Sequence, residues 1–255
     1  MDTLKINPSA ETRRITGFIK NVLAKQSFEK VVIGLSGGVD SATAFYLLKE
    51  VIKPQNIFVA HLYYFESQIK AIEPMLKQAG IPKENIYELS IAPMVKAFQI
   101  LKQVQDDKVR LGNIMARVRM IALFDIAKKN NALVCGTENR SEHLLGYFTR
   151  FGDEASDIEP IQHLYKTQIY ELAKHLGVPN EIIQKSPSAN LWEAQTDEGE
   201  FGFSYKEADL VLYYYFEKKK SLDKISKDFP NAKKIIDRVN SNAFKHRLPY
   251  RITNS

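Results

Sequence analysis

The chain has only one cysteine, Cys135, among its 255 residues. A single cysteine excludes an internal disulfide and a cysteine-based metal site, and we interpret Cys135 as a small core residue. The chain also lacks any run of about 18 apolar residues, so we expect no span across a membrane. Its first residues, Met1–Lys5, lack the apolar core of a signal peptide. Together these absences predict a cytoplasmic location.

A concentrated basic patch is also missing, although the chain carries a net charge of +6. The lysines are spread out apart from two short runs, Lys218–Lys220 and Lys233–Lys234, which we interpret as solvated helix faces. We therefore expect no nucleic-acid partner. A positive balance also suits a protein whose substrates are phosphorylated anions. The hydrophobic fraction of 44% supports a sizeable core, and the length indicates a single domain over residues 1–255.

Apolar residues in the first half of the chain alternate between helical and strand patterns. Helices are expected at 12–25, 41–52, 69–79, 92–104 and 107–129. Short buried strands are expected at 31–35, 57–62, 86–89 and 132–135. Strands that alternate with helices in this way predict an α/β fold, with a doubly wound, mostly parallel sheet and helices on both faces.

The second half of the chain has a different texture. Residues 144–166 show no clear period and hold glycines, aromatic and charged residues, and a long loop of this kind in a compact domain is usually functional. A further loop is expected at 186–203. A helix is expected at 168–176 with Thr167 as its N-cap, and another begins with Pro179 as its first residue. A third is expected from a capping box at Ser204–Glu207 to about Lys218. Two shorter helices are expected at 221–228 and 231–243.

A glycine turn at residues 36–42, Ser-Gly-Gly-Val-Asp-Ser-Ala, joins the first strand to the helix that follows it. Such a turn directs unpaired backbone N–H groups and the positive end of the helix dipole at one point. Gly37 and Gly38 lack Cβ, so an anion can touch the backbone there. Asp40 would repel phosphate unless a cation such as Mg²⁺ lay between them. The turn therefore predicts a site for a metal-bound polyphosphate.

The alternative interpretation is a tight β–α turn in which Ser36 or Asp40 caps the helix. The turn is not a Walker A loop, because no Gly-Lys-Ser/Thr follows, and it is not GxGxxG. It resembles the PP-loop of the N-type ATP pyrophosphatases. Members of that superfamily cleave ATP between the α and β phosphates and adenylate an oxygen of the substrate, and a nitrogen or sulfur nucleophile then displaces AMP.

Polar residues also follow the fourth predicted strand, in the segment Gly136–Glu142. Since ligands on an open α/β sheet bind at the carboxyl ends of its strands, we expect this segment to form a second wall of the same pocket. Taken by itself, the segment also fits a helix N-terminus that Glu138 or Glu142 stabilises.

Further segments make the resemblance specific, because in chain order they are similar to elements of ammonia-dependent NAD⁺ synthetase. They are Gly112–Arg117 (GNxxAR), Gly136–Glu142 (GTxxxxE), Tyr147–Asp153 (GFFTKYGD), Lys166–Thr167 (LxK), Ser186–Leu191 (PxADL) and Gly202–Tyr205 (LGxxY). The resemblance runs from residue 34 to residue 249. It implies a sheet of the adenine nucleotide alpha hydrolase type and a homodimer. It also implies the conversion of deamido-NAD⁺, ammonia and ATP to NAD⁺, AMP and pyrophosphate, with Mg²⁺.

The same resemblance implies roles for individual residues. ATP would contact Gly34, Leu35, Ser36, Gly37, Gly38, Val39, Asp40, Ser41, Thr137, Lys166 and Ser188. Deamido-NAD⁺ would contact Arg117, Arg150, Asp157 and Lys245, and Asp40 and Glu142 would hold Mg²⁺. Mg²⁺ and Lys166 would neutralise charge on the departing pyrophosphate. Asp153 or Asp157 could accept the proton of ammonium, although a structural carboxylate or a ribose ligand fits them equally well.

This chain departs from the family pattern at three positions. Arg150 stands where the family usually has Lys, and Ser188 stands where it usually has Thr. Phe244 stands where many members have His, so it cannot form a hydrogen bond there. We expect Phe244 to be a core residue, with stacking on a ring as the alternative. His61 is interpreted as a cap at the end of its strand, and Tyr213–Phe216 as packing or a subunit contact.

Three other functions are alternatives to this one. A glutamine-dependent form needs an added amidotransferase domain with a nucleophilic cysteine, for which the 255 residues leave no room, so we expect ammonia to be free or supplied by another protein. A pyrophosphatase that thiolates tRNA would favour catalytic cysteines and a basic patch. A non-catalytic sensor of adenine nucleotides would not need Asp40, Glu142 and Lys166 to converge.

Overall fold

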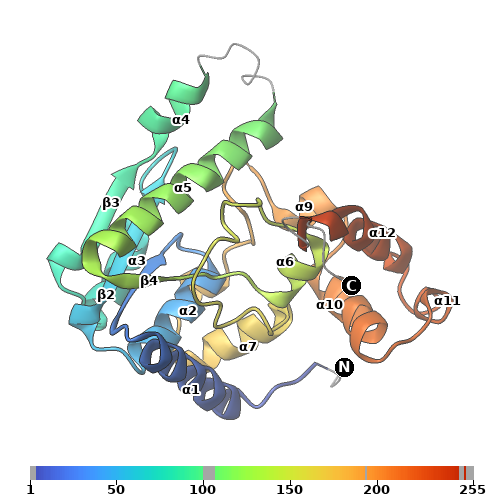
Figure 1. Cartoon of the computed structure of the whole chain (residues 1–255). Helices are drawn as coiled ribbons and strands as arrows, with labels where there is room; N and C mark the ends of the chain where they lie inside the picture. The colour runs from blue at the N-terminus through green and yellow to red at the C-terminus, as the bar shows by residue number, and fades with distance from the viewer. Residues whose placement is uncertain (1–3, 100–106, 193, 247–249, 251–255) are drawn as a thin grey trace.

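The computed structural model describes residues 4–99, 107–192, 194–246 and 250. The chain up to residue 135 forms a parallel four-stranded sheet in the order β3–β2–β1–β4 (Figure 1). The strands are β1 (Lys30–Gly34), β2 (Ile57–Tyr63), β3 (Ile86–Ser90) and β4 (Ala132–Cys135). All four predicted strands and their parallel pairing are confirmed.

Successive residues of β1 face opposite sides of the sheet, and both sets are buried, so the sheet is covered on both sides here. Val31 and Ile33 belong to a core shared with α1 (Pro8–Gln26), α2 (Val39–Lys49), α3 (Ile69–Gln78) and α7 (Lys166–Leu176). Val32 instead joins a cluster with Ile126 of the long helix α5 (Lys108–Asn130). Helices therefore cover both faces, as the doubly wound arrangement requires.

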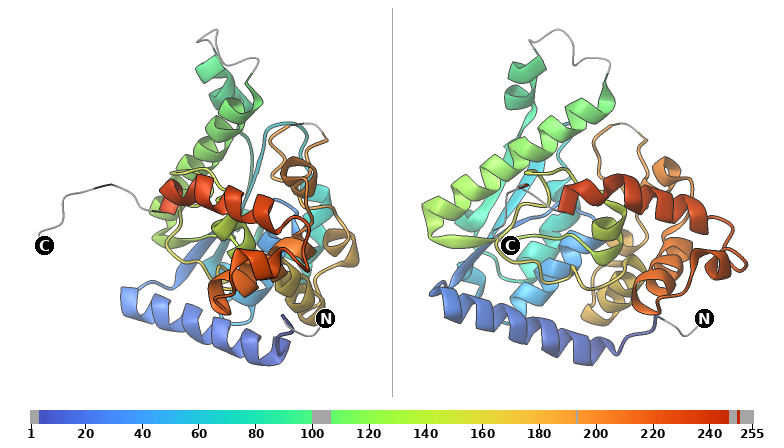
Figure 2. Two further views of the ribbon diagram at one scale, coloured as in Figure 1. Left: turned by 90° about the vertical axis from the view of Figure 1, so that its right-hand side faces the viewer. Right: turned by 45° about the vertical axis from the view of Figure 1, so that its right-hand side comes forward.

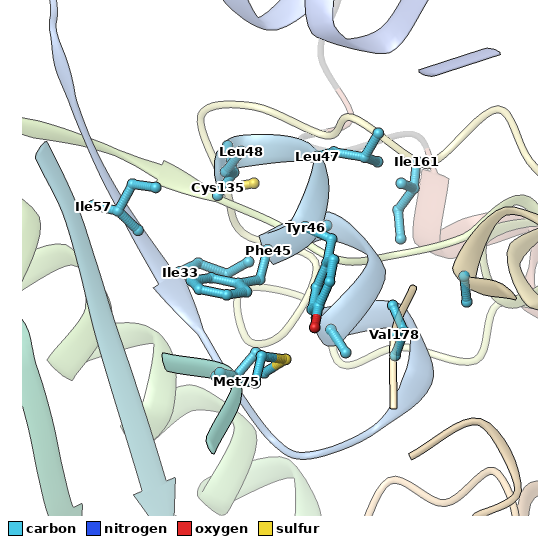
Figure 3. Packing of buried hydrophobic residues seen from close by; sticks show 14 of the residues in the cluster. Ile33, Phe45, Tyr46, Leu47, Leu48, Ile57, Met75, Cys135, Ile161 and Val178 are labelled. Atoms are coloured by element: carbon cyan, nitrogen blue, oxygen red, sulfur yellow. The ribbon is translucent and has the colours of Figure 1, made fainter. Parts of the chain in front are cut away.

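The first of these cores is dense around α2, which is buried along almost its whole length. Phe45 lies between the sheet residues Ile33 and Ile57 and the helix residue Met75 (Figure 3). Cys135 is buried in the same cluster, where burial raises the pKa of its thiol, so it is the small core residue that its position predicted. No helix in the described part of the chain has the length and apolarity to cross a membrane.

Short helices after β4 lie beside the sheet (Figure 2), and most of them, though not α8, supply residues to a second hydrophobic cluster. They are α6 (Arg140–Leu145), α8 (Asn180–Ile183), α9 (Asp197–Phe201), α10 (Tyr205–Leu212), the π-helical turn Tyr213–Glu217, α11 (Leu222–Ile225) and α12 (Ala232–Asn242). The remaining helix, α4 (Ala92–Gln99), follows β3. Short 3₁₀ turns occur at Pro54–Asn56, Lys83–Asn85 and Ala243–His246.

Several predicted boundaries differ from the structure. The expected N-cap Thr167 lies inside α7, which begins at Lys166 with Tyr165 as N-cap, because the N–H and hydroxyl of Thr167 both donate to buried Asp209. Pro179 is the N-cap of α8 and not its first residue.

The predicted helix from Ser204 to Lys218 is α-helical only as far as Leu212 and then widens into the π-turn. The Ser204 side chain caps this helix as expected, but Glu207 binds Asn231 instead of closing a capping box. The last residues of the expected helix 92–104 lie outside the described residues.

Candidate active site

A cavity of about 880 Å³ opens at the carboxyl ends of the strands, where the sequence predicts the site. This volume falls in the upper part of the usual range for small-molecule sites. The glycine turn after β1 and residues 136–137 after β4 line one side of the cavity. The segments Gly146–Asp153 and Lys185–Asp197 supply further lining residues. Segments that are far apart in the chain therefore converge on one pocket.

The glycine turn is braced by its own two serines. Ser36 Oγ and Ser41 Oγ lie 3.1 Å apart, Ser36 Oγ accepts from the Gly38 N–H, and Ser41 Oγ donates to the Gly38 carbonyl. Gly37 has a φ of +80°, which favours glycine. The N-cap of α2 is Gly38 and no side chain caps the helix, so the alternative interpretation of Ser36 or Asp40 as caps is wrong. The N-terminus of α2 is left open to an anion.

Three charged side chains from three helices meet beside this turn. Lys166 Nζ donates to Asp40 Oδ2 at 2.6 Å and to Glu142 Oε1 at 3.1 Å. The second oxygen of Asp40 accepts from Asn139 Nδ2 at 2.9 Å. Lys166 is 2% exposed and its ammonium lies 5.1 Å from the centre of the Tyr205 ring. The convergence of Asp40, Glu142 and Lys166, which distinguishes an enzyme from a nucleotide sensor, is therefore present.

Burial and charge act against each other in this group. Burial raises the pKa of Glu142, and neighbouring Lys166 only partly offsets that rise. Burial lowers the pKa of Lys166, but Asp40 and Glu142 together outweigh burial, so the net shift is upward. Lys166 consequently remains an ammonium at neutral pH and carries a full positive charge into the cavity.

The same pair of carboxylates fits a magnesium–nucleotide complex. Asp40 and Glu142 are hard oxygen donors aimed at one point, and Mg²⁺ is usually held by one or two carboxylates together with phosphate oxygens. Among the described residues, no three metal-ligating side chains form a cluster, so substrate oxygens would have to complete the coordination. Lys166 occupies the space between the two carboxylates and would have to yield it to the cation.

The residues expected to contact the dinucleotide do not all line the cavity. Lys245 lines it and donates to the carbonyls of Gly146 and Phe148 at 2.6 and 2.8 Å. Arg117 Nε donates to the Arg150 carbonyl at 3.2 Å, and neither arginine is among the lining residues.

Phe244 is not a core residue, and that expectation is wrong. Its side chain is 45% exposed, and the guanidinium of Arg150 lies 5.0 Å from its ring centre. The stacking alternative is the one observed, with a cation as the stacked group. Two departures from the family pattern, at 150 and 244, are thus in contact with each other.

Of the remaining predicted residues, three line the cavity and one holds a loop in place. Thr137 and Ser188 line the cavity, and Asp153 lines it while accepting the Thr149 N–H at 2.9 Å. Asp157 is not a lining residue, because its carboxylate accepts the Val134 N–H at 2.7 Å and so anchors the loop to β4.

Two parts of the site were not predicted from the sequence. Asn139 caps α6 and forms a capping box with Glu142, so the helix-start interpretation of this segment holds together with the functional one. The spacing Asn-x-x-Glu could have revealed it. Asp197 is buried in the wall, where it accepts the hydroxyls of Tyr147 and Tyr205 at 3.1 and 3.0 Å. No sequence signal pointed to these contacts.

An uncapped helix start, two carboxyl groups and a buried lysine at the carboxyl ends of the strands of a doubly wound sheet are typical of a nucleotide-dependent α/β enzyme. The sequence matches the profile of the NAD synthase family over residues 11–249. The chain therefore belongs to the NAD synthase family.

Individual relatives agree with this assignment. The chain is 38% identical over 252 residues to an NH₃-dependent NAD⁺ synthetase from Fusobacterium nucleatum, covering 98% of this chain and 97% of that one. It is similar to the solved structure of an NMN synthetase from Francisella tularensis, with a TM-score of 0.83, 32% identity and coverage of 98% and 100%. It is also similar to an NH₃-dependent NAD synthetase from Campylobacter jejuni in complex with nitrate, with a TM-score of 0.80, 30% identity and coverage of 97% and 100%.

Proposed function

We propose that the protein is a ligase that amidates deamido-NAD⁺ with ammonia and ATP, and so produces NAD⁺, AMP and pyrophosphate. The observation that carries this proposal is the Lys166 ammonium held between Asp40 and Glu142 at the open N-terminus of α2. This arrangement places an ammonium and the open N-terminus of α2 where a triphosphate would lie against the glycine turn, with two carboxyl groups beside them that a cation could bridge to phosphate.

The reaction has two steps. A carboxylate is a poor acylating agent, because its leaving group would be oxide. An oxygen of the nicotinate carboxylate attacks the α-phosphorus of ATP, the bond to the β-phosphate oxygen breaks, and pyrophosphate leaves. The product is an acyl adenylate. The nitrogen of ammonia then attacks the carbonyl carbon, AMP leaves with the bridging oxygen, and the nitrogen loses one proton.

The residues of this chain would divide the work as follows. The turn Gly34–Ser41, Thr137 and Ser188 bind ATP, and Lys166 stabilises charge on the departing pyrophosphate. Asp40 and Glu142 would hold Mg²⁺, which when bound neutralises phosphate charge. Asp153 on the cavity wall would accept the proton from ammonium.

The dinucleotide would be held by Arg117, Arg150, Asp157 and Lys245, in a site completed by a second copy of the chain. Two observations support a homodimer. Exposed apolar side chains gather on α4 and α5, including Val109 and Ile121 at 62% and 57% exposure. Arg117 is exposed one helical turn before Ile121 on α5, so the substrate residue and the apolar residue share a face. We also propose a cytoplasmic location for this ATP-dependent reaction.

One experiment tests the function and the choice of acceptor together. Purified protein with ATP, Mg²⁺ and ammonium should convert deamido-NAD⁺ to NAD⁺, measured by chromatography, and glutamine in place of ammonium should give little product. Nicotinic acid mononucleotide is the second acceptor to test, because a structural relative is an NMN synthetase. If kcat/KM is higher for the mononucleotide, the mononucleotide and not the dinucleotide is the substrate. If neither compound is amidated, the proposal is refuted.

A further inference from the structure

His61 lies near the end of β2 and is 4% exposed, yet it also lines the cavity. It does not act as a simple cap of its strand, because both ring nitrogens bind backbone groups of other segments. Nδ1 lies 2.9 Å from the Leu35 carbonyl oxygen, and Nε2 accepts the Gln68 N–H at 3.0 Å. His61 therefore bridges the glycine turn after β1 and the segment before α3.

These two contacts determine where the ring carries its proton. A carbonyl oxygen can only accept, so Nδ1 must carry the hydrogen and donate it to Leu35. A backbone N–H can only donate, so Nε2 must be unprotonated to receive Gln68. Only the neutral ring with hydrogen on Nδ1 satisfies both partners.

Leu35 is the point at which the sheet passes into the phosphate-binding turn. Its N–H donates to the Ala60 carbonyl at 2.9 Å, which is a sheet contact to β2. Its own carbonyl is held by His61 of the same strand, so both sides of this residue are fixed to β2. The next residue, Ser36, begins the serine brace of the turn. His61 thus sets the position from which the turn starts.

The contact continues to the opposite wall of the cavity. Gln68 Oε1 accepts from Lys185 Nζ at 2.7 Å, and Lys185 immediately precedes the segment that contains Ser188. Leu35, His61, Gln68 and Lys185 all line the cavity. One hydrogen-bonded path therefore connects the turn, the segment before α3 and the segment after α8.

We propose that His61 is a positioning residue for ATP: it holds the phosphate-binding turn in register through Leu35 and ties it to the Lys185 segment through Gln68. This role rests on the proposed function, since the turn must bind ATP for its position to matter. Both ring nitrogens of His61 are taken up by backbone groups, so we assign it a positioning role and no step of the chemistry.

Two substitutions separate the two contacts of the ring. His61→Asn places an amide Nδ2 at the position of Nδ1, so it keeps a donor for Leu35 and loses the acceptor for Gln68. His61→Gln places Oε1 at the position of Nε2, so it keeps the acceptor and loses the donor. We expect His61→Gln to raise KM for ATP about tenfold and His61→Asn to leave it within about twofold, because loss of the donor leaves a buried carbonyl unpaired. We expect kcat to change little in both variants.

Exposed His175 provides the matched control, and the same two substitutions there should leave KM for ATP unchanged. Equal KM values for His61→Gln and His61→Asn, or a wild-type KM in His61→Gln, would overturn the proposal and leave His61 a structural residue.

A spectroscopic test is independent of activity. Imidazole ¹⁵N NMR of the wild-type protein should show His61 neutral with its hydrogen on Nδ1, and a hydrogen on Nε2 would overturn the assignment. If the wild type makes no NAD⁺, the proposed function fails, while the NMR result still decides the arrangement of His61.

Discussion

Lys166 Nζ lies 2.6 Å from Asp40 Oδ2, although the two residues are 126 positions apart in the chain. The contact joins the start of α7 to the first turn of α2 and places a buried cation beside the phosphate-binding turn. Asp40 and Glu142 together keep the ammonium at this end of the cavity, where it can offset charge that builds on a departing pyrophosphate.

Removing the ammonium should therefore slow the chemistry. We expect Lys166→Ala to lower the turnover number roughly 10²- to 10³-fold, as loss of one charge-stabilising group does in other enzymes. The measurement is the rate of AMP formation at saturating ATP. Lys174→Ala, at an exposed position of the same helix, is the control and should behave as wild type. A turnover number unchanged by Lys166→Ala would remove this lysine from the mechanism.

Gly136 should tolerate no side chain. A Cβ there would overlap the carboxyl group of Glu159 and would lie 2.8 Å from Ser156 Cβ. We expect Gly136→Ala to lower the free energy of unfolding by about 1–3 kcal/mol, measured by urea denaturation.

Gly17 supplies the opposite case in the same measurement. It lies inside α1 with nothing within 4 Å of an added Cβ, so Gly17→Ala should stabilise the fold by about 0.5–1 kcal/mol. Equal effects at the two positions would contradict the packing described around Gly136.

Asp209 should make stability depend on pH. Burial raises the pKa of this carboxyl to about 6, and hydrogen bonds from Ser141 and Thr167 only partly oppose the rise. An unfolded aspartate titrates near pH ~4, so between about pH 4 and 6 the unfolded chain loses its proton first. The free energy of unfolding therefore falls as the pH rises through this window, by on the order of 3 kcal/mol.

Asp209→Asn cannot titrate and isolates this contribution. Asparagine keeps one acceptor oxygen and nearly the same shape. Relative to Asp209→Asn, the wild type should lose free energy of unfolding as the pH rises from 4 to 7. Above pH 7 the difference between the two proteins should stay constant. A difference that is the same at both pH values would show that the folded pKa of Asp209 is not raised.

The exposed face of α5 should carry the subunit contact. We expect the wild type to be a dimer by light scattering and Ile121→Asp to shift it toward monomer, because a buried unpaired charge is costly at an interface. Phe18→Asp, at an exposed apolar residue of α1, is the control and should remain dimeric. An active wild-type monomer would refute the shared dinucleotide site.

Much of the fold could be predicted because apolar residues recur along the sequence with the period of a helix or of a strand. The buried strands and the long helices each repeat over enough residues to show a pattern, and α2 follows its glycine turn directly. The short helices α6 and α9 have too few turns to show a period, so they fell within or beside predicted loops. Thr167 looked like a cap because its buried partner Asp209 lies 42 positions away.

The candidate site follows the same division. Asp40, Glu142 and Lys166 belong to motif segments, so their convergence could be expected from a resemblance. The contact of Arg150 with Phe244, and the two bonds of His61, depend on which segments lie side by side in space. No local pattern names those partners, and only the structure supplies them.

The central claim is that this site cleaves ATP at the α-phosphate to activate a carboxylate. The most direct measurement is to incubate the protein with ATP, Mg²⁺, deamido-NAD⁺ and ammonium and to identify the nucleotide product. We predict AMP and pyrophosphate in amounts equal to the NAD⁺ formed. ADP and inorganic phosphate as the products would contradict the account.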